Sequence, residues 1–292
     1  MIGEKMIARI IRIISKEYTL MDDKGNRYDA ILTGKIRMQM KPAAGDLVEA
    51  VRLDHRWVVE KILPRINKLI RPSVANIDQA LIVMSVKSPD FSPALIDRLS
   101  VLIMSSGIQP MLIVTKCDLG IEPDFEERIE EYERGPMHVI RTGKGSLDPS
   151  LAGILEGKIS VLTGQTGAGK STLLNELEPS FHLATQETSK ALGRGKHTTR
   201  HNELHPVAGG LVADTPGFSS LDFSRISAQE LASYVPDFLP YLGQCRFNDC
   251  IHQNEPGCAV KDAVERGDIP RVRYEDYLQI MQMIQNRKER YL

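Results

Sequence analysis

The chain has 292 residues, which is long for one compact domain and suits two or three. Hydrophobic residues make up 42% and charged residues 26%, an ordinary globular composition, and 37 Lys and Arg against 38 Asp and Glu leave a net charge of -1. This balance excludes a globally basic nucleic-acid-binding protein, so any such binding has to come from local patches.

The N-terminal stretch MIGEKMIARI has neither a long apolar core nor a small-residue cleavage site, which argues against secretion. No stretch approaches the roughly 20 apolar residues of a membrane span. We therefore expect a cytoplasmic protein without a membrane partner, and a monomer by default. In that compartment, four Cys favour metal ligation or free thiols over disulfides.

Residues 1–66 are predicted to form a small all-β barrel, with an OB-fold as the leading candidate. The strand-like runs are MIARIIRII, then YTLMDDKGNRYDAIL with a hairpin turn at Asp-Lys-Gly-Asn, then KPAAGDLVEAV and RWVVEKIL. The segment holds 13 Lys and Arg against 9 Asp and Glu, a balance that fits an RNA-facing barrel and an ordinary solvated surface equally well. Trp57 is expected to pack in the barrel rather than to stack on a base.

Residues 67–222 change to apolar strands that alternate with helical segments, which predicts a doubly wound α/β domain. The runs ALIVMSV, PMLIVT, ISVLTG and GLVADT are continuously apolar, as in parallel strands covered on both faces. Between the first two, Ser92 as N-cap, Pro93 in the first turn and Gly107 near the end predict a helix. Residues 223–292 are predicted to form a helical domain around a Cys/His cluster.

The stretch ISVLTGQTGAGKSTLLNEL matches the phosphate-binding pattern G-x-x-x-x-G-K-[ST], between the apolar strand and the helix that this motif requires. The glycines let the backbone turn so that its N–H groups face phosphate oxygens. Lys170 is expected to neutralise charge on the β- and γ-phosphates, and the Ser171 hydroxyl to bind Mg²⁺. The predicted nucleotide-binding residues of this loop are Gly164, Gln165, Thr166, Gly167, Ala168, Gly169, Lys170, Ser171 and Thr172.

Two segments downstream complete the predicted phosphate side of the site. The stretch GLVADTPGF puts Asp214 at the end of an apolar strand, where a P-loop NTPase keeps its Mg²⁺-side carboxylate, and Gly217 where a backbone N–H would reach a γ-phosphate. Before it, ETSKALGRGKHTTRHNEL is rich in Gly, Thr and basic residues, which predicts a mobile loop that orders around γ-phosphate and Mg²⁺. Thr198 or Thr199 would bind Mg²⁺ from this loop, and we favour Thr199.

The stretch IVTKCDLG, which precedes the P-loop, is typical of the base-reading loop of a GTPase. The Asp118 carboxylate can accept hydrogen bonds from the ring N–H and the exocyclic amine of guanine, a pair that adenine does not offer. The stem of Lys116 can lie over the base plane, and Thr115, in place of the usual Asn, can tie the loop to neighbouring backbone. A second base-contacting loop is expected at HVIRTGKG, where Arg141 and Thr142 replace the usual Ser-Ala, so its contacts are left open.

These motifs follow one another as base loop, second base loop, P-loop, mobile loop and D-T-P-G, which is the GTPase set in cyclically rotated order. Such a rotation is physically reasonable, because the termini of compact domains often lie close together and surface loops tolerate new ends. With the barrel motif KPAAGDLV, the linker IRPSVANIDQALIV and the Cys/His cluster, essentially the whole chain resembles the circularly permuted, ribosome small-subunit-dependent GTPases (ribosome small subunit GTPase A).

The resemblance implies three domains: an RNA-binding OB-fold at 1–66, a permuted GTPase domain at 67–222 and a zinc-binding helical domain at 223–292. It also implies a role in late maturation of the small ribosomal subunit through rRNA binding. Hydrolysis of GTP to GDP and phosphate would be stimulated by that subunit. Arg200 stands where a third Thr is common in the family.

The stretch QCRFNDCIHQNEPGC has the spacing C-x4-C-x-H-x5-C, which offers three thiolates and one imidazole from Cys245, Cys250, His252 and Cys258. This closed tetrahedral set suits one structural Zn²⁺ per chain and leaves no open position for catalysis. Such a site organises a segment too poor in apolar residues to fold alone. The alternative is three incidental reduced Cys and a surface His; Cys117, in the base loop, is expected not to ligate.

Hydrolysis is expected to proceed by in-line attack of water on the γ-phosphate. Phe218 follows D-T-P-G, where Ras-type enzymes keep a Gln that orients the water, and a phenyl ring cannot do this. His197, in GKHTT, is the nearest candidate, and the resemblance gives it the catalytic role; an RNA-contacting or solvated His is the alternative. Two other functions stay open: a nucleotide-gated RNA-binding module with incidental hydrolysis, and a P-loop ATPase or kinase, which would leave TKCD and the Cys/His cluster without a role.

Overall fold

The computed structural model describes residues 4–34, 36, 40–69, 73–181, 202–217 and 221–289. The chain packs into two compact units, each assembled from segments that are far apart in sequence. The first unit holds Met1–Gln79, Pro149–Thr163 and Ser171–Gly217, and the second holds Ala80–Asp148, Gly164–Lys170 and Phe218–Leu292. Among the described helices, none combines the length and apolarity needed to cross a membrane.

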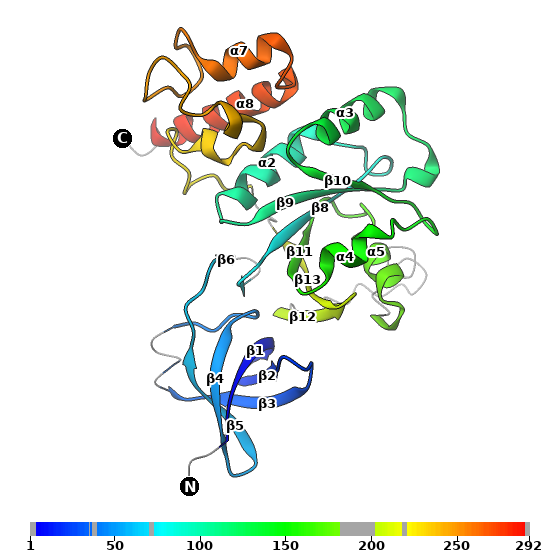
Figure 1. The fold of residues 1–292 in the computed structure, drawn as a ribbon, viewed down its shortest axis with the longest axis vertical. Helices are drawn as coiled ribbons and strands as arrows, with labels where there is room; N and C mark the ends of the chain where they lie inside the picture. The colour runs from blue at the N-terminus through cyan, green and yellow to red at the C-terminus, as the bar shows by residue number, and fades with distance from the viewer. Residues whose placement is uncertain are drawn as a thin grey trace. The chain divides into compact units, whose positions relative to one another are not determined.

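The first unit starts with a closed barrel (Figure 1). Its strands are β1 (Lys5–Ile14), β2 (Glu17–Met21), β3 (Arg27–Leu32), β4 (Leu47–Leu53) and β5 (Arg56–Ile62). β1 pairs with β2, β2 with β3, β3 with β5 in parallel, β5 with β4, and β4 again with β1. This order is that of an OB-fold, so the predicted barrel is confirmed.

The barrel interior follows from the alternation along its strands, in which every second side chain faces inward. Ile10, Leu20 and Val59 are completely buried there. Trp57 is 8% exposed and its ring lies 5.7 Å from that of Tyr28, edge to face. The indole therefore packs in the barrel, as predicted, and is not a free stacking platform.

Polar side chains fix the segment that leaves the barrel. The Asn76 amide donates to the Gly45 carbonyl and accepts from the Ile66 N–H. The buried Asp46 carboxylate accepts two hydrogen bonds from the Arg65 guanidinium, at 2.6 and 2.7 Å. The short strands β6 (Lys68–Leu69) and β7 (Val74–Ala75) pair within this segment. The linker is therefore attached to the barrel rather than trailing from it.

The rest of the first unit forms around two parallel strands. Its elements are α4 (Ser150–Leu155), β11 (Ile159–Thr163), α5 (Lys170–Leu177), η2 (Pro179–Phe181), β12 (Asn202–Val207) and β13 (Gly210–Gly217). β11 and β13 are parallel, whereas β12 forms a hairpin with β13. β12, which the sequence patterns did not predict, also pairs with β1 of the barrel at Arg12↔Glu203 and Ile13↔Asn202. Within this unit the barrel and the strands beside it therefore share one continuous ladder.

The second unit has an α/β part and a helical part. Its elements are β8 (Gln79–Ser85), α2 (Pro93–Met104), β9 (Gln109–Thr115), η1 (Cys117–Leu119), α3 (Pro123–Arg134), β10 (His138–Arg141), η3 (Leu231–Tyr234), η4 (Pro236–Tyr241), α7 (Ala259–Arg266) and α8 (Arg271–Glu289). β9 and β10 are parallel, and every residue of β8 is buried, as the apolar runs predicted. α2 begins at Pro93 after Ser92, although the Ser92 hydroxyl makes no cap hydrogen bond.

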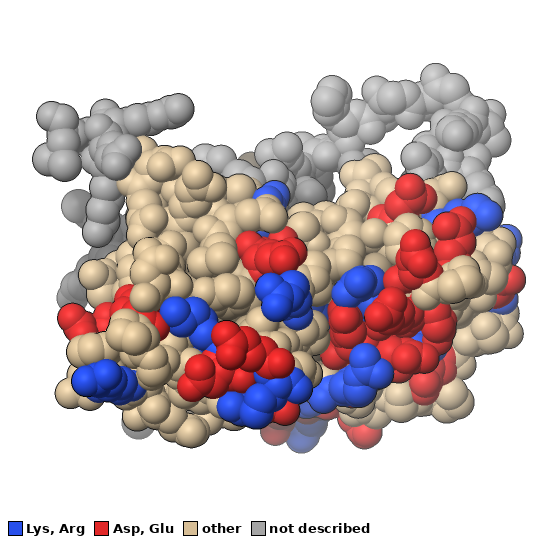
Figure 2. All heavy atoms as spheres, turned by 90° about the horizontal axis from the view of Figure 1, so that it is seen from above, with Lys and Arg blue, Asp and Glu red and all other residues tan. Residues whose placement is uncertain are grey.

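One apolar core joins the C-terminal helices to α2. Phe238 and Tyr277 are completely buried with their rings 4.9 Å apart, and Val101 and Leu102 of α2 belong to the same core. On the face drawn in Figure 2, acidic and basic side chains of the described residues are interspersed. That distribution agrees with the near-zero net charge.

Candidate nucleotide and metal sites

The P-loop, Gly164–Lys170, has the tight backbone that its glycines predict. Gly164 has a φ of +127°, and a Cβ at this position would lie 2.0 Å from the carbonyl oxygen of Val83. Only glycine fits this approach. The Lys170 ammonium donates to the carbonyls of Gly164 and Gln165, at 2.9 and 2.7 Å. Lys170 thus lies across the loop whose N–H groups form the predicted phosphate cradle, and Ser171 and Thr172 follow in the first turn of α5.

The predicted base loop lies against this P-loop. The Thr115 hydroxyl donates to the Ala168 carbonyl at 2.6 Å, and the Met84 carbonyl lies 3.2 Å away. A hydroxyl has one proton to donate, so the shorter contact is the hydrogen bond. Thr115 is 5% exposed, which keeps water from competing for this bond. The threonine makes the tie to neighbouring backbone that was expected of it.

The predicted second base loop lies at Thr142–Ser146, directly beside Asp118. The Lys144 N–H donates to Asp118 Oδ1 at 2.9 Å, and the Cys117 N–H donates to the Thr142 carbonyl at 3.1 Å. A Cβ on Gly143 would lie 2.7 Å from the same Asp118 oxygen, so a side chain would push the carboxylate away. The Lys144 N–H thus holds Asp118 and Gly143 leaves room for its carboxylate, contacts that the sequence left open.

Arg141 takes no part in that contact. Its guanidinium donates to both carboxylate oxygens of Glu133, at 2.6 and 2.9 Å, and to Glu126 at 2.5 Å, both on α3. The hydrogen bonds to Glu133 raise the pKa of Arg141 further above its ordinary value. The signal for the second base loop was therefore the Gly-Lys pair after Arg141-Thr142, since a glycine leaves room for the carboxylate.

Lys116 adopts a left-handed backbone conformation, with a φ of +62°. Its ammonium donates to the carbonyls of Lys87 and Ser88, at 3.1 and 2.5 Å. Partial burial lowers the pKa of Lys116, and burial raises the pKa of the Cys117 thiol next to it. Both directions agree with a loop that lies partly inside the protein.

The predicted γ-phosphate side is described in part. The backbone of β13 carries Asp214 to Gly217, and Gly217 pairs with Thr163, the residue before the P-loop. This pairing puts the D-T-P-G end of β13 beside Thr163, the last residue of β11. His197, Thr198 and Thr199 lie outside the described residues.

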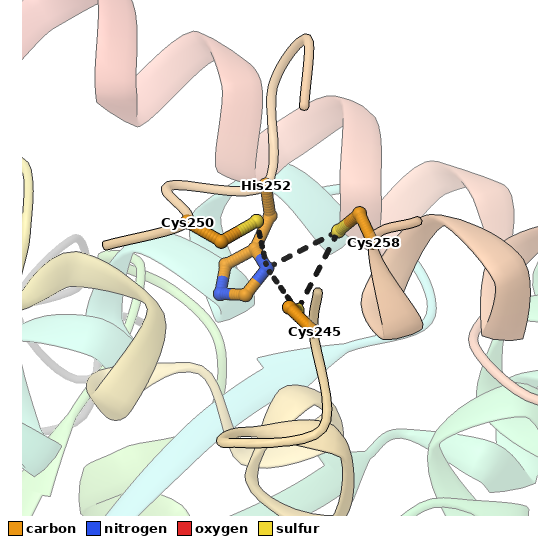
Figure 3. Close-up of side chains that lie close together, drawn as sticks. All are labelled: Cys245, Cys250, His252 and Cys258. Atoms are coloured by element: carbon orange, nitrogen blue, oxygen red, sulfur yellow. Dashed lines mark hydrogen bonds between the residues drawn. The ribbon is translucent and has the colours of Figure 1, made fainter. Parts of the chain in front are cut away.

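The Cys/His cluster is compact (Figure 3). His252 Nδ1 lies 3.6, 3.5 and 3.3 Å from the sulfurs of Cys245, Cys250 and Cys258, and the Cys245 and Cys258 sulfurs are 4.0 Å apart. A tetrahedral zinc with Zn–S of about 2.3 Å and Zn–N of about 2.0 Å requires ligand separations of about 3.5 to 3.8 Å. All four ligand atoms lie within 4.8 Å of one another, so the cluster fits a metal ion of this size.

The surroundings of the cluster suit metal ligation. Burial lowers the pKa of His252, which keeps the imidazole neutral, and burial raises the pKa of the Cys250 thiol to about 12 in the absence of a cation. Burial also raises the pKa of the Cys258 thiol, which directly precedes α7, so both thiols need the charge of a bound cation to ionise. The hydroxyls of Tyr274 and Tyr277 donate to the carbonyls of His252 and Ile251, at 2.8 and 2.6 Å. Helix α8 thereby fixes the backbone that presents the imidazole.

The chain is similar to known proteins over nearly its whole length. The family model described as RsgA GTPase matches residues 62–224. The small ribosomal subunit biogenesis GTPase RsgA 2 of Oceanobacillus iheyensis is 44% identical, over 97% of this chain and 99% of its own. The small ribosomal subunit biogenesis GTPase RsgA of Geobacillus kaustophilus is also 44% identical, with the same shares covered.

Two solved structures agree. The crystal structure of YloQ, a circularly permuted GTPase, superposes with a TM-score of 0.82 at 36% identity, over 97% of this chain and 96% of that one. The crystal structure of YjeQ from Thermotoga maritima superposes with a TM-score of 0.84 at 34% identity, over 96% of this chain and 99% of that one.

Proposed function

The chain belongs to the RsgA GTPase family and is thereby a GTP hydrolase, and from this premise we propose that it hydrolyses GTP to GDP and phosphate on the small ribosomal subunit. The names of its relatives state a role in small ribosomal subunit biogenesis. We assign the chain to the late maturation of that subunit, with rRNA binding by the barrel and stimulation of turnover by the subunit.

The hydrogen bond from Thr115 to the Ala168 carbonyl carries the guanine-nucleotide part of this proposal. It joins the loop that would read the base to the loop that would hold the phosphates, so one nucleotide would span both. Asp118, already held by the Lys144 N–H, would accept from the ring N–H and amine of guanine. The stem of Lys116 would cover the base plane.

On the phosphate side, the backbone N–H groups of the P-loop and the Lys170 ammonium would stabilise the charge that spreads over the γ-phosphoryl group in the transition state. Ser171 and Thr199 are the proposed ligands of a Mg²⁺ ion, and Asp214 is the proposed Mg²⁺-side carboxylate. A bound Mg²⁺ supplies positive charge between the β- and γ-phosphates. Gly217 would offer its N–H to the γ-phosphate, and His197 would orient the attacking water.

For the Cys/His cluster we propose one structural Zn²⁺. The short separations between His252 Nδ1 and three sulfurs support this, because three thiolates and an imidazole form a closed zinc set. Such an ion would hold the segment 245–258 together rather than act on substrate.

We propose three domains. The barrel at 1–66 binds rRNA, the GTPase domain at 67–222 binds GTP and GDP, and the helical domain at 223–292 binds zinc. We place the protein in the cytoplasm as a monomer. The family match over 62–224 and the closed barrel before it support these limits.

Turnover measurements test this function. GTP hydrolysis is measured with and without purified small subunits, for the wild type, for His197→Ala and for a control, His138→Ala, which changes an exposed histidine at the start of β10. We expect small subunits to accelerate the wild type and the control, and not His197→Ala. Absence of acceleration in the wild type would rule out the proposed function, whereas acceleration that persists in His197→Ala would remove only that histidine from the mechanism.

A further inference from the structure

The turn after β8 contacts the base loop, and no sequence motif predicts this contact. The Ser85 hydroxyl donates to the Pro89 carbonyl at 2.6 Å and closes the turn 85–89, and Ser85 is completely buried. The Val86 N–H donates to the Thr115 carbonyl at 3.1 Å. The turn is thus attached both to its own strand and to the end of β9.

Two backbone carbonyls of this turn accept hydrogen bonds from Lys116. Its ammonium donates to Lys87 and Ser88. A carbonyl pair offers a fixed pair of acceptors for a cation. A lysine has a flexible four-carbon stem, and only a fixed partner at its end holds that stem in one direction.

We propose that the turn 85–89, which we call the lysine seat, positions the stem of Lys116 across the guanine face and thereby sets nucleotide affinity without touching the nucleotide. This inference rests on the proposed guanine site at Asp118. The seat keeps the side chain in its binding conformation before the nucleotide arrives, so binding loses less conformational entropy.

The strained backbone at Lys116 supports the assignment. A φ of +62° is unfavourable for a residue with a side chain and persists only when its surroundings hold it. Here the holding contacts act on both sides, through Thr115 on Ala168 and through Cys117 on the Thr142 carbonyl. The residues on either side of Lys116 are therefore fixed, and the ammonium at the end of its stem is bonded to the seat.

A double-mutant cycle tests the seat. Ser85→Ala removes the bond that closes the turn, and Lys116→Met removes the ammonium but keeps an unbranched apolar stem. Affinities for GDP and for inosine diphosphate, which lacks the exocyclic amine, are measured by calorimetry for both variants and for the double variant. Because the Lys116 side chain loses its fixed conformation, we expect Ser85→Ala to lower the affinity for both nucleotides by the same factor, about 3- to 10-fold.

In the Lys116→Met background, Ser85→Ala should have no further effect, because the ammonium that the seat holds is gone. Ser105→Ala is the matched control, since it removes a similar bond, from a serine hydroxyl to the Leu102 carbonyl in α2, and it should leave both affinities unchanged. Thermal unfolding of each variant checks that the chain stays folded.

Two outcomes would overturn the seat. One is an unchanged affinity in a folded Ser85→Ala variant. The other is a Ser85→Ala effect that multiplies with that of Lys116→Met, which would mean that the turn acts through another residue. A wild type that binds ADP as well as GDP would instead remove the guanine site itself, and the proposed function with it.

Discussion

The Cys/His cluster and the base loop are built in opposite ways. The four proposed metal ligands lie within residues 245–258, so their spacing alone brings them together. The base loop is held by three segments distant from it in sequence: the turn after β8, the second base loop and the P-loop. A local cluster can be predicted from its residues, whereas a non-local one is defined by hydrogen bonds that only the fold creates.

The largest expected effect concerns the local cluster. Removing one ligand by Cys258→Ser, or adding a chelator, should unfold the segment around it, because structural zinc contributes about 10–16 kcal/mol in small zinc domains at neutral pH. Hydrogen exchange of residues 244–289 and native mass spectrometry of bound metal measure this. Cys117→Ser should keep both the metal and the protection, since Cys117 lies outside the cluster. A metal-free wild type with full protection would contradict the role of the ion.

The next effect concerns the non-local site. Asp118→Asn should lower the affinity for GDP on the order of 10⁴-fold, because the guanine N–H groups lose their acceptor. It should also favour xanthosine diphosphate, whose carbonyl at position 2 accepts from the new amide. Competition binding with both nucleotides measures the switch, and Asp124→Asn, in the first turn of α3, serves as the control. Equal GDP binding by Asp118→Asn and the wild type would mean that the base is read elsewhere.

A third effect tests another long-range tie, between α2 and α8. The buried Arg273 donates to both Asp97 oxygens, at 2.7 and 2.9 Å, and lies over the Tyr132 ring. Burial raises the pKa of Asp97 from 3.8 to about 7. The native state therefore binds more protons than the unfolded state between about pH 4 and pH 7, and stability falls as pH rises through that range.

Arg273 offsets the charge that Asp97 acquires, so the destabilisation by Arg273→Met should grow with pH. We expect it to be small at pH 5 and to reach about 3–5 kcal/mol near pH 8, as measured by urea unfolding. Arg266→Met, which breaks only the exposed pair with Asp268, should cost at most about 1 kcal/mol at either pH. A pH-independent loss in Arg273→Met would mean that packing, rather than charge, is the main contribution.

The smallest effect concerns the tie between base loop and P-loop. Thr115→Val keeps the shape but leaves the Ala168 carbonyl without its buried donor, a loss of about 1–3 kcal/mol. GDP affinity measured by calorimetry should fall by about 10-fold or more on that basis. Thr115→Ser keeps the hydroxyl and should bind like the wild type. If Val and Ser variants bind GDP alike, the hydroxyl does not organise the site.

The same contrast explains which features could be predicted. The P-loop, the Cys/His cluster and the barrel follow from local spacing and from alternation, and their residues lie where the patterns put them. The contacts of the second base loop did not follow, because Arg141 pairs with carboxylates that a helix brings to it. β12 was missed because its strand character depends on pairing with β13 and β1. The roles of His197 and Thr199 lie outside the described residues and stay predictions.

The pairing of β12 with β1 has a mechanical consequence. Glu203 and Asn202 lie on β12, which forms a hairpin with β13, and the end of β13 carries D-T-P-G. The same two residues pair with Arg12 and Ile13 of β1. A ladder of backbone hydrogen bonds hardly stretches, because its geometry permits little change in length. A sideways displacement of this hairpin must therefore either move strand β1 of the barrel with it or break the pairing at these two positions.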